Sequence, residues 1–222
     1  PLLSHAQGQG PNLTDDRVYG VVLDGYKDNS TMITEYIYWN SVNGDLEAPF
    51  YNDEEQAVTV SLRSVNITSR DIDSDGVVDI PVTEFLPGYD NTSEAPMYLT
   101  LWYNADFGAG GCSFQSKKKN IINLSEGYSV TWQNSWEKKV TCRLDEKNRT
   151  LYFYHYQKDR FAFSDELFRI RVFTHDEWKK DRHDPDNTVV LNETDESVCA
   201  AILSGNQDLV DRRIIEAAFS LI

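Results

Sequence analysis

The sequence has very little cysteine and no long apolar segment. Its 222 residues include only three cysteines, Cys112, Cys142 and Cys199, and no Cys-x-x-Cys pair, which argues against a zinc knuckle or a redox dithiol. The odd number leaves at least one thiol without a partner inside the chain, and whether Cys142 and Cys199 pair stays open. No apolar run reaches the roughly 18 residues that span a bilayer, so we expect no membrane insertion.

Basic residues are scarce relative to acidic ones. The chain carries 21 Lys and Arg against 36 Asp and Glu, a formal net charge of −15. A surface this negative repels phosphate backbones and anionic lipids, so nucleic acid is not an expected partner. The charge suits a secreted protein that must stay soluble, or one that collects cations. We therefore expect an extracellular or cell-envelope location.

The chain begins at Pro1 with "PLLSHAQGQGPNLTDD", which has no signal-peptide pattern. We expect residues 1–14 to be a flexible lead-in. We also expect an upstream part to be missing, either further repeats or a removed N-terminus that carried a lipid anchor.

The first half of the sequence predicts an antiparallel β domain over residues 15–108. Short β-branched and aromatic runs alternate with Gly, Asn and Asp turns, which predicts strands at 17–26, 32–40, 57–67, 76–85 and 97–104. Residues 22–44 and 85–108 also match each other through a Leu-x-Gly-Tyr motif followed by Trp and Asn. This match predicts a repeat of propeller-blade type, although two blades cannot close a propeller.

The stretch "DIDSDGVVD" (71–79) has the spacing of a metal-binding loop. Carboxylates at alternate positions turn towards one point if the backbone curls, and Gly76 permits the positive φ that a tight curl needs. Hard oxygen ligands of this kind suit Ca²⁺. The predicted ligands are Asp71, Asp73, Asp75, the Val77 carbonyl and Asp79. The alternative is an acidic turn satisfied by water alone.

An EF-hand does not fit this loop. Its twelfth position, which must supply a bidentate Glu, is Val82, and Pro81 opposes an exiting helix. The residues instead resemble the D-x-D-x-D-G-x-x-D loops of integrin α-chain propellers and of bacterial FG-GAP and VCBS repeats. That resemblance implies a structural Ca²⁺ that fixes a hairpin between two strands.

The second half predicts a linker at 109–125 and an α+β module at 126–222. Strands are predicted at 127–132, 138–144, 150–156, 166–173, 188–193 and 197–203. Thr174 and Glu177 form a capping box for a short helix. Residues 206–222 predict an amphipathic closing helix capped by Asn206. The predicted fold class is thus mixed β and α+β, ending in an antiparallel sheet and a C-terminal helix.

A predicted sheet whose first strand is followed by Trp136, and which ends in an apolar helix reading "AAFSLI", resembles the PsbP type of α+β module. The stretch "GYSVTWQNSW" followed by "LFRIRVFTHDEW" also resembles C-terminal modules of uncharacterised secreted proteins and lipoproteins from Gram-positive gut bacteria, which often carry acidic calcium loops upstream. This resemblance implies a fold and a location but no activity.

One further surface is a candidate for binding a protein or glycan. The alternating tyrosines of one strand and two arginines of a neighbouring strand could line a groove, or could simply pack: Tyr152, Tyr154, Tyr156, Arg169 and Arg171. No nucleophile motif accompanies them. The favoured hypothesis is a non-enzymatic, calcium-stabilised binding or scaffolding protein. The alternative is a hydrolase or glycan-active enzyme with its site at the junction of the two domains.

Overall fold

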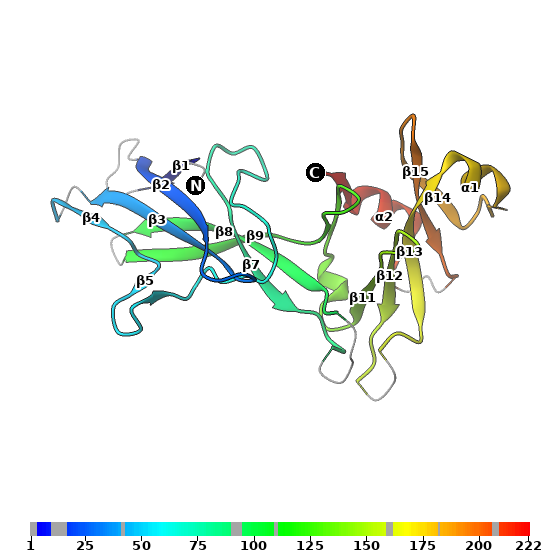
Figure 1. The fold of residues 1–222 in the computed structure, drawn as a ribbon, viewed down its shortest axis with the longest axis horizontal. Coiled ribbons are helices and arrows are strands. Elements are labelled where there is room, and N and C mark those ends of the chain that lie inside the picture. Colours follow the sequence, from blue (N-terminus) through cyan, green and yellow to red (C-terminus); the bar gives the residue numbers. More distant parts are fainter. Residues whose placement is uncertain are drawn as a thin grey trace. The chain divides into compact units, whose positions relative to one another are not determined.

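The computed structural model describes residues 4–9, 17–40, 43–89, 95–108, 111–158, 162–181, 183–205 and 209–222. The chain divides into two compact units, residues 1–84 with 100–118 and residues 85–99 with 119–222. Antiparallel sheets dominate and helices are few, so the predicted mixed β and α+β class is confirmed (Figure 1). Within the described ranges, no helix is long and apolar enough to cross a bilayer.

A four-stranded antiparallel sheet opens the first unit. Its strands lie side by side in chain order: β1 (Ser4–Gln9), β2 (Arg17–Tyr26), β3 (Met32–Asn40) and β4 (Asp45–Glu47). The predicted lead-in is therefore wrong for residues 4–9, which pair with β2 along their whole length. This pairing uses main-chain groups, which a Gly- and Gln-containing segment supplies without any apolar alternation. The other residues of 1–14 lie outside the described ranges.

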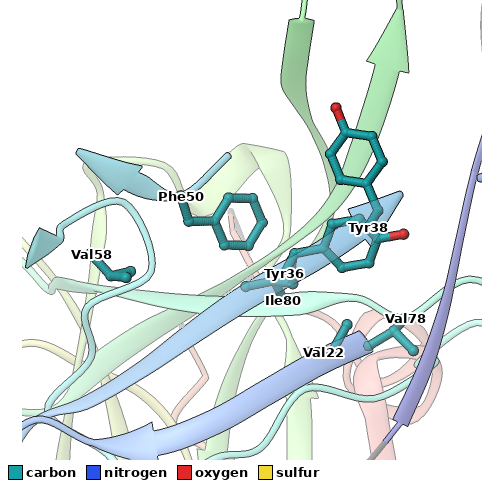
Figure 2. Packing of buried hydrophobic residues seen from close by; sticks show 7 residues of the cluster. All are labelled: Val22, Tyr36, Tyr38, Phe50, Val58, Val78 and Ile80. Atoms are coloured by element: carbon teal, nitrogen blue, oxygen red, sulfur yellow. The ribbon is translucent and has the colours of Figure 1, made fainter. Parts of the chain in front are cut away.

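The core of the first unit forms where β2 and β3 face the following loop and β7 (Ile80–Phe85) (Figure 2). Alternation along β3 sends Tyr36 and Tyr38 inward, and their rings stack with centroids 5.8 Å apart. Tyr36 also packs against Phe50 at 6.4 Å. A Cβ at Gly20 would lie 2.5 Å from the Tyr36 ring, so glycine lets this ring lie across β2. The complete cluster is Val22, Tyr36, Tyr38, Phe50, Val58, Val78 and Ile80.

The strand predicted over 57–67 is wrong beyond its first residues. A short hairpin of β5 (Tyr51–Asn52) and β6 (Ala57–Val58) replaces its start. Further on, Arg63 forms only an isolated bridge with Met32. The buried side chains of Ser61 and Arg63 donate to backbone carbonyls, which competes with a regular ladder.

A second sheet has the order β16-β10-β9-β8-β7. It comprises β7, β8 (Tyr98–Gly108), β9 (Gly111–Asn123), β10 (Tyr128–Thr131) and β16 (Phe219–Leu221). The predicted linker at 109–125 is wrong, because β9 is a long strand with neighbours on both sides. Its Gly and Lys residues predicted a loop, but ladder pairing needs only main-chain groups. β7, β8 and β9 each have residues in both units, so the two compact units meet within these strands, whereas the sequence predicted a division at 108 and 126.

The second unit contains the predicted C-terminal sheet, in the order β11-β12-β13-β15-β14 (Figure 1). Its strands are β11 (Val140–Asp145), β12 (Thr150–His155), β13 (Glu166–Thr174), β14 (Thr188–Glu193) and β15 (Ser197–Leu203). All of them lie where strands were predicted. The capping box is confirmed at α1 (His175–Lys180), where Thr174 and Glu177 bond each other's backbone N–H.

The core of this unit is aromatic. Trp136, in a short 3₁₀ helix (Asn134–Trp136, η1), is fully buried against Phe153 and Phe168, whose rings stack with centroids 4.1 Å apart. The Trp136 indole N–H donates to the Leu209 carbonyl at 3.0 Å. This contact ties the segment before the last helix to the sheet.

The closing helix is shorter than predicted. α2 covers only Arg212–Ala218, Asp211 caps it, and the chain then continues as β16 beside β10. The predicted cap, Asn206, lies outside the described residues. Ile215 and Ala218 are its buried residues. The prediction failed because the apolar end of the chain, read as helix, pairs with a distant strand.

The predicted repeat stays a prediction, and its two stretches differ at two of the matched positions. Gly25 lies inside β2, whereas Gly88 has a φ of +95° in a turn after β7. Trp39 is 57% exposed, whereas Trp102 is fully buried. At these two positions the stretches share a sequence pattern but differ in backbone conformation or in burial.

Candidate metal centre

The acidic loop is closed by a two-residue bridge in the first unit. Arg70 and Asp79 exchange both backbone hydrogen bonds, at 3.1 and 2.9 Å. Between them the chain curls through positive φ angles at Ser74 (62°) and Gly76 (84°). The curl expected at the glycine is therefore present, and it also uses the preceding serine.

Three of the predicted carboxylates converge. One oxygen from each of Asp71, Asp73 and Asp79 lies within 4.8 Å of the other two. Ca²⁺ holds its oxygen ligands at about 2.3–2.6 Å, so two ligands on opposite sides of one ion are separated by roughly twice that distance. The observed spacing fits a shared ion, although exposed acids also gather without one.

Asp79 is the buried member of the trio. Its neighbours Val78 and Ile80 belong to the hydrophobic core, which anchors the backbone at this point (Figure 2). Its side chain is fully buried, and its Oδ2 accepts the Ile72 N–H at 2.9 Å. Burial, followed by the charges of the other acids of the loop, raises the pKa of Asp79 to about 6. A cation here would relieve both causes.

Asp75 does not join the trio. Its Oδ1 accepts the Val77 N–H at 2.8 Å and its Oδ2 pairs with Lys117 Nζ at 3.1 Å. Burial raises its pKa, but these two partners together hold the pKa of Asp75 below its ordinary value. The predicted roles of Asp75 and of the Val77 carbonyl as ligands therefore stay predictions, and the observed contact of Val77 is through its N–H.

Lys117 is the residue that sequence reasoning missed. It comes from β9, and its ammonium lies 3.1 Å from Asp75 and 4.0 Å from Asp73. With its amide oriented to suit both neighbours, Asn104 of β8 donates to Asp79 Oδ1 and accepts from Lys117 Nζ at 3.1 Å. The hydrogen bond to Asp75 and the nearby carboxylates raise the pKa of Lys117. In the sequence, Lys117 falls in the predicted linker. Assignment of β9 as a strand next to β8 would have brought Lys117 close to the acidic loop.

The tyrosine and arginine surface of the second unit is partly assembled. Tyr152 and Tyr154 stack with ring centroids 6.0 Å apart, but Tyr154 is buried against Phe163. The ring of Tyr156 lies 3.3 Å from where a Cβ at Gly88 would be, so the glycine turn packs closely on it.

The two arginines have partners within the chain. Arg169 pairs with Glu166 at 3.0 Å, and Arg171 pairs with Glu177 at 3.4 Å while its guanidinium lies over the Phe173 ring. These contacts account for packing, and binding of a ligand here stays a prediction.

The two described thiols are structural. Cys142 and Cys199 are both free and buried, so they do not pair. Burial raises the pKa of Cys199 to about 12 and raises that of Cys142 as well, which keeps both thiols neutral. The side chain of Cys112 lies outside the described part of the chain.

The chain matches no protein-family model, no curated protein and no solved structure. The argument for function therefore depends on the geometry of the site.

Proposed function

We propose that this chain is a calcium-stabilised protein of the cell envelope or extracellular space, with a binding or scaffolding role rather than a catalytic one. The observation that carries the proposal is the convergence of Asp71, Asp73 and Asp79 to within 4.8 Å. Three carboxylates at this separation repel one another, and a divalent cation between them removes the repulsion.

The choice of Ca²⁺ follows from the ligands and from the loop. All of the side-chain donors are carboxylate oxygens, which favour hard cations over softer ones. The loop has an irregular backbone, with positive φ angles at Ser74 and Gly76, and Ca²⁺ accepts an irregular shell of six to eight oxygens. Mg²⁺ requires near-ideal octahedral coordination, so this irregular loop suits it less well than Ca²⁺. Main-chain carbonyls and water would complete the shell.

The proposed location follows from affinity and charge. Extracellular calcium modules bind at about 10⁻⁴–10⁻³ M, which suits a small site of this kind. The net charge of −15 keeps such a protein soluble and attracts cations, while it disfavours nucleic acid. The unidentified ligand would then be a protein or a glycan.

The proposed role of the ion is structural because of where the acids lie. All three come from one loop, and Asp79 is joined to the core through its two neighbours in sequence. An ion bound here would fix the entry to β7. Asp79 faces the interior and its carboxylate is already bonded on both oxygens, so it is poorly placed to receive a substrate.

Calorimetric titration of chelator-treated protein with CaCl₂ tests the proposal. We expect one site in the wild type, and loss of binding in Asp73→Asn. Glu54→Gln, an exposed acid of the same unit outside the loop, is the matched control and should bind as the wild type does. Absence of heat from the wild type at millimolar Ca²⁺ would remove the proposed function.

A further inference from the structure

A buried ion pair lies in the first unit beside the acidic loop. Arg63, in the irregular segment after β6, has a fully buried side chain, and its Nη2 donates to Asp24 Oδ1 of β2 at 2.7 Å. Asp24 is itself only 9% exposed. Neither residue belongs to the metal-binding trio.

The guanidinium is bonded on every side. Its Nε donates to the Ile67 carbonyl at 2.6 Å, and its Nη1 donates to the Thr34 hydroxyl at 2.8 Å and to the Ser61 carbonyl at 3.2 Å. These partners come from β3 and from both ends of the irregular segment. Arg63 therefore fixes residues 61–67 against the sheet, which the planar fork of arginine can do and a lysine cannot.

Asp24 extends the network to the start of the loop. Its Oδ2 accepts the Ser69 N–H at 2.8 Å and its Oδ1 accepts the Ser69 hydroxyl at 2.9 Å. The next residue, Arg70, forms the backbone bridge to Asp79. Hydrogen bonds and two consecutive peptide bonds thus join the buried carboxylate of Asp24 to two of the trio, Asp71 and Asp79.

We propose that Asp24 and Arg63, with Thr34, Ser61 and Ser69, form a clasp that positions Asp71 and Asp79 for cation binding. This inference rests on the proposed function. Asp24 acts as a positioning residue through Ser69 and Arg70, and it does not touch the ion. The clasp holds the loop at the bridge, where it would otherwise be free to move before the ion arrives.

The chemistry of the clasp suits positioning better than simple stabilisation. A buried ion pair contributes little net stability compared with well-packed apolar side chains of the same volume. Its hydrogen bonds are directional, however, and the fork of Arg63 fits only one arrangement of its partners. The pair therefore specifies where the segment lies.

Calcium titration of Asp24→Asn tests the clasp. This variant removes the charge but keeps the size, and we expect the Kd to weaken by about tenfold, the lower end of the effect of residues that support metal ligands. Glu126→Gln is the matched control, because it breaks the Arg149 pair in the second unit, and its Kd should stay within about twofold of the wild type. An unchanged Kd in folded Asp24→Asn, or equal weakening in the control, would overturn the proposal.

Ser69→Ala is the milder variant if Asp24→Asn does not fold. It removes the hydroxyl bonds to Asp24 and Thr34 and leaves the ion pair intact. We expect a Kd weakened by roughly threefold, since only the two hydrogen bonds of the Ser69 hydroxyl are lost and the Ser69 N–H still donates to Asp24. A wild-type affinity in this variant would count against the clasp.

Hydrogen exchange separates this inference from the proposed function. In metal-free protein, Asp24→Asn or Ser69→Ala should speed exchange at the Arg70 and Asp79 amides, which form the bridge. If the wild type binds no Ca²⁺, the proposed function falls while the clasp is still judged by these rates. Unchanged rates at both amides would overturn the clasp.

Discussion

Asp79 combines two conditions that a carboxyl group normally avoids. It is fully buried, and it faces the charges of Asp71, Asp73 and Asp75. Burial disfavours its ionised form and the neighbouring acids disfavour it further, so its proton is held up to a pH of about 6. The metal-free loop is therefore a source of pH-dependent stability.

We expect the metal-free protein to become less stable as the pH rises from about 4 to about 7. The pKa of Asp79 is raised from 3.8 to about 6 in the folded state, so its stabilising contribution is full below the unfolded value and is lost as the pH rises through the folded one. The loss is of the order of 2–3 kcal/mol. Urea unfolding in a chelator across this range measures it. Asp79→Asn should not show this loss of unfolding free energy between pH 4 and 7. If the unfolding free energy of the variant fell with pH as much as that of the wild type, the loss could not be assigned to Asp79.

Lys117 supplies a tethered positive charge at the same acids. Its ammonium pairs with Asp75 and approaches Asp73, so it offsets part of the repulsion that a bound cation would otherwise remove. A lysine in this position would compete electrostatically with the proposed Ca²⁺, and its pairing with Asp75 joins β9 to the loop in the metal-free protein.

Replacing Lys117 with Met should strengthen calcium binding and lower the stability of the metal-free protein. A unit charge at about 4 Å contributes roughly 1 kcal/mol even in bulk water and more near a protein surface, so we expect the affinity to rise about tenfold. Lys118→Met makes the same change in net charge one residue further along β9. Calcium titration of both variants therefore separates the effect of the Lys117–Asp75 ion pair from the effect of net charge. Equal affinities in the two variants would show that proximity to Asp75 is irrelevant.

At the scale of elements, local signals decided which strands could be predicted. β11 to β15 follow clear alternation and turn residues, and α1 begins at a capping box, so their positions follow from short stretches of sequence. β9 and β16 carry no such signal. β9 pairs through its main-chain groups with β8 and β10, its neighbours in sequence, whereas β16 exists because the distant β10 pairs with it.

The acidic loop shows the same division between local and distant information. The spacing of the aspartates predicted that Asp71, Asp73 and Asp79 would gather, because a tight curl brings alternate side chains together. The spacing could not predict the burial of Asp79, which depends on Val78 and Ile80 entering the core. Nor could it place Lys117, since the pairing of β8 and β9 brings that ammonium to the loop.

At the scale of the whole molecule, the chain consists of two compact units with separate cores. The first is built around Tyr36 and Phe50, and the second around Trp136 and Phe153. The candidate metal loop and the clasp belong entirely to the first unit. Three strands have residues in both, so the backbone of the units is continuous even though their cores are distinct.

Calcium should therefore stabilise the first unit and leave the second largely unchanged. An ion that binds only the folded loop adds RT ln(1 + [L]/Kd), about 2.7 kcal/mol at a hundredfold excess over Kd. Hydrogen exchange with and without calcium measures where this stabilisation acts. Amides of β2, β3 and residues 70–84 should gain protection, whereas those of α2 and β13 should not. Replacing both Asp73 and Asp75 with Ala should abolish the gain and any calcium-dependent rise in Tm. Equal protection in α2 and in the first unit would mean that the two cores unfold together as one cooperative structure, contrary to the division seen in the fold.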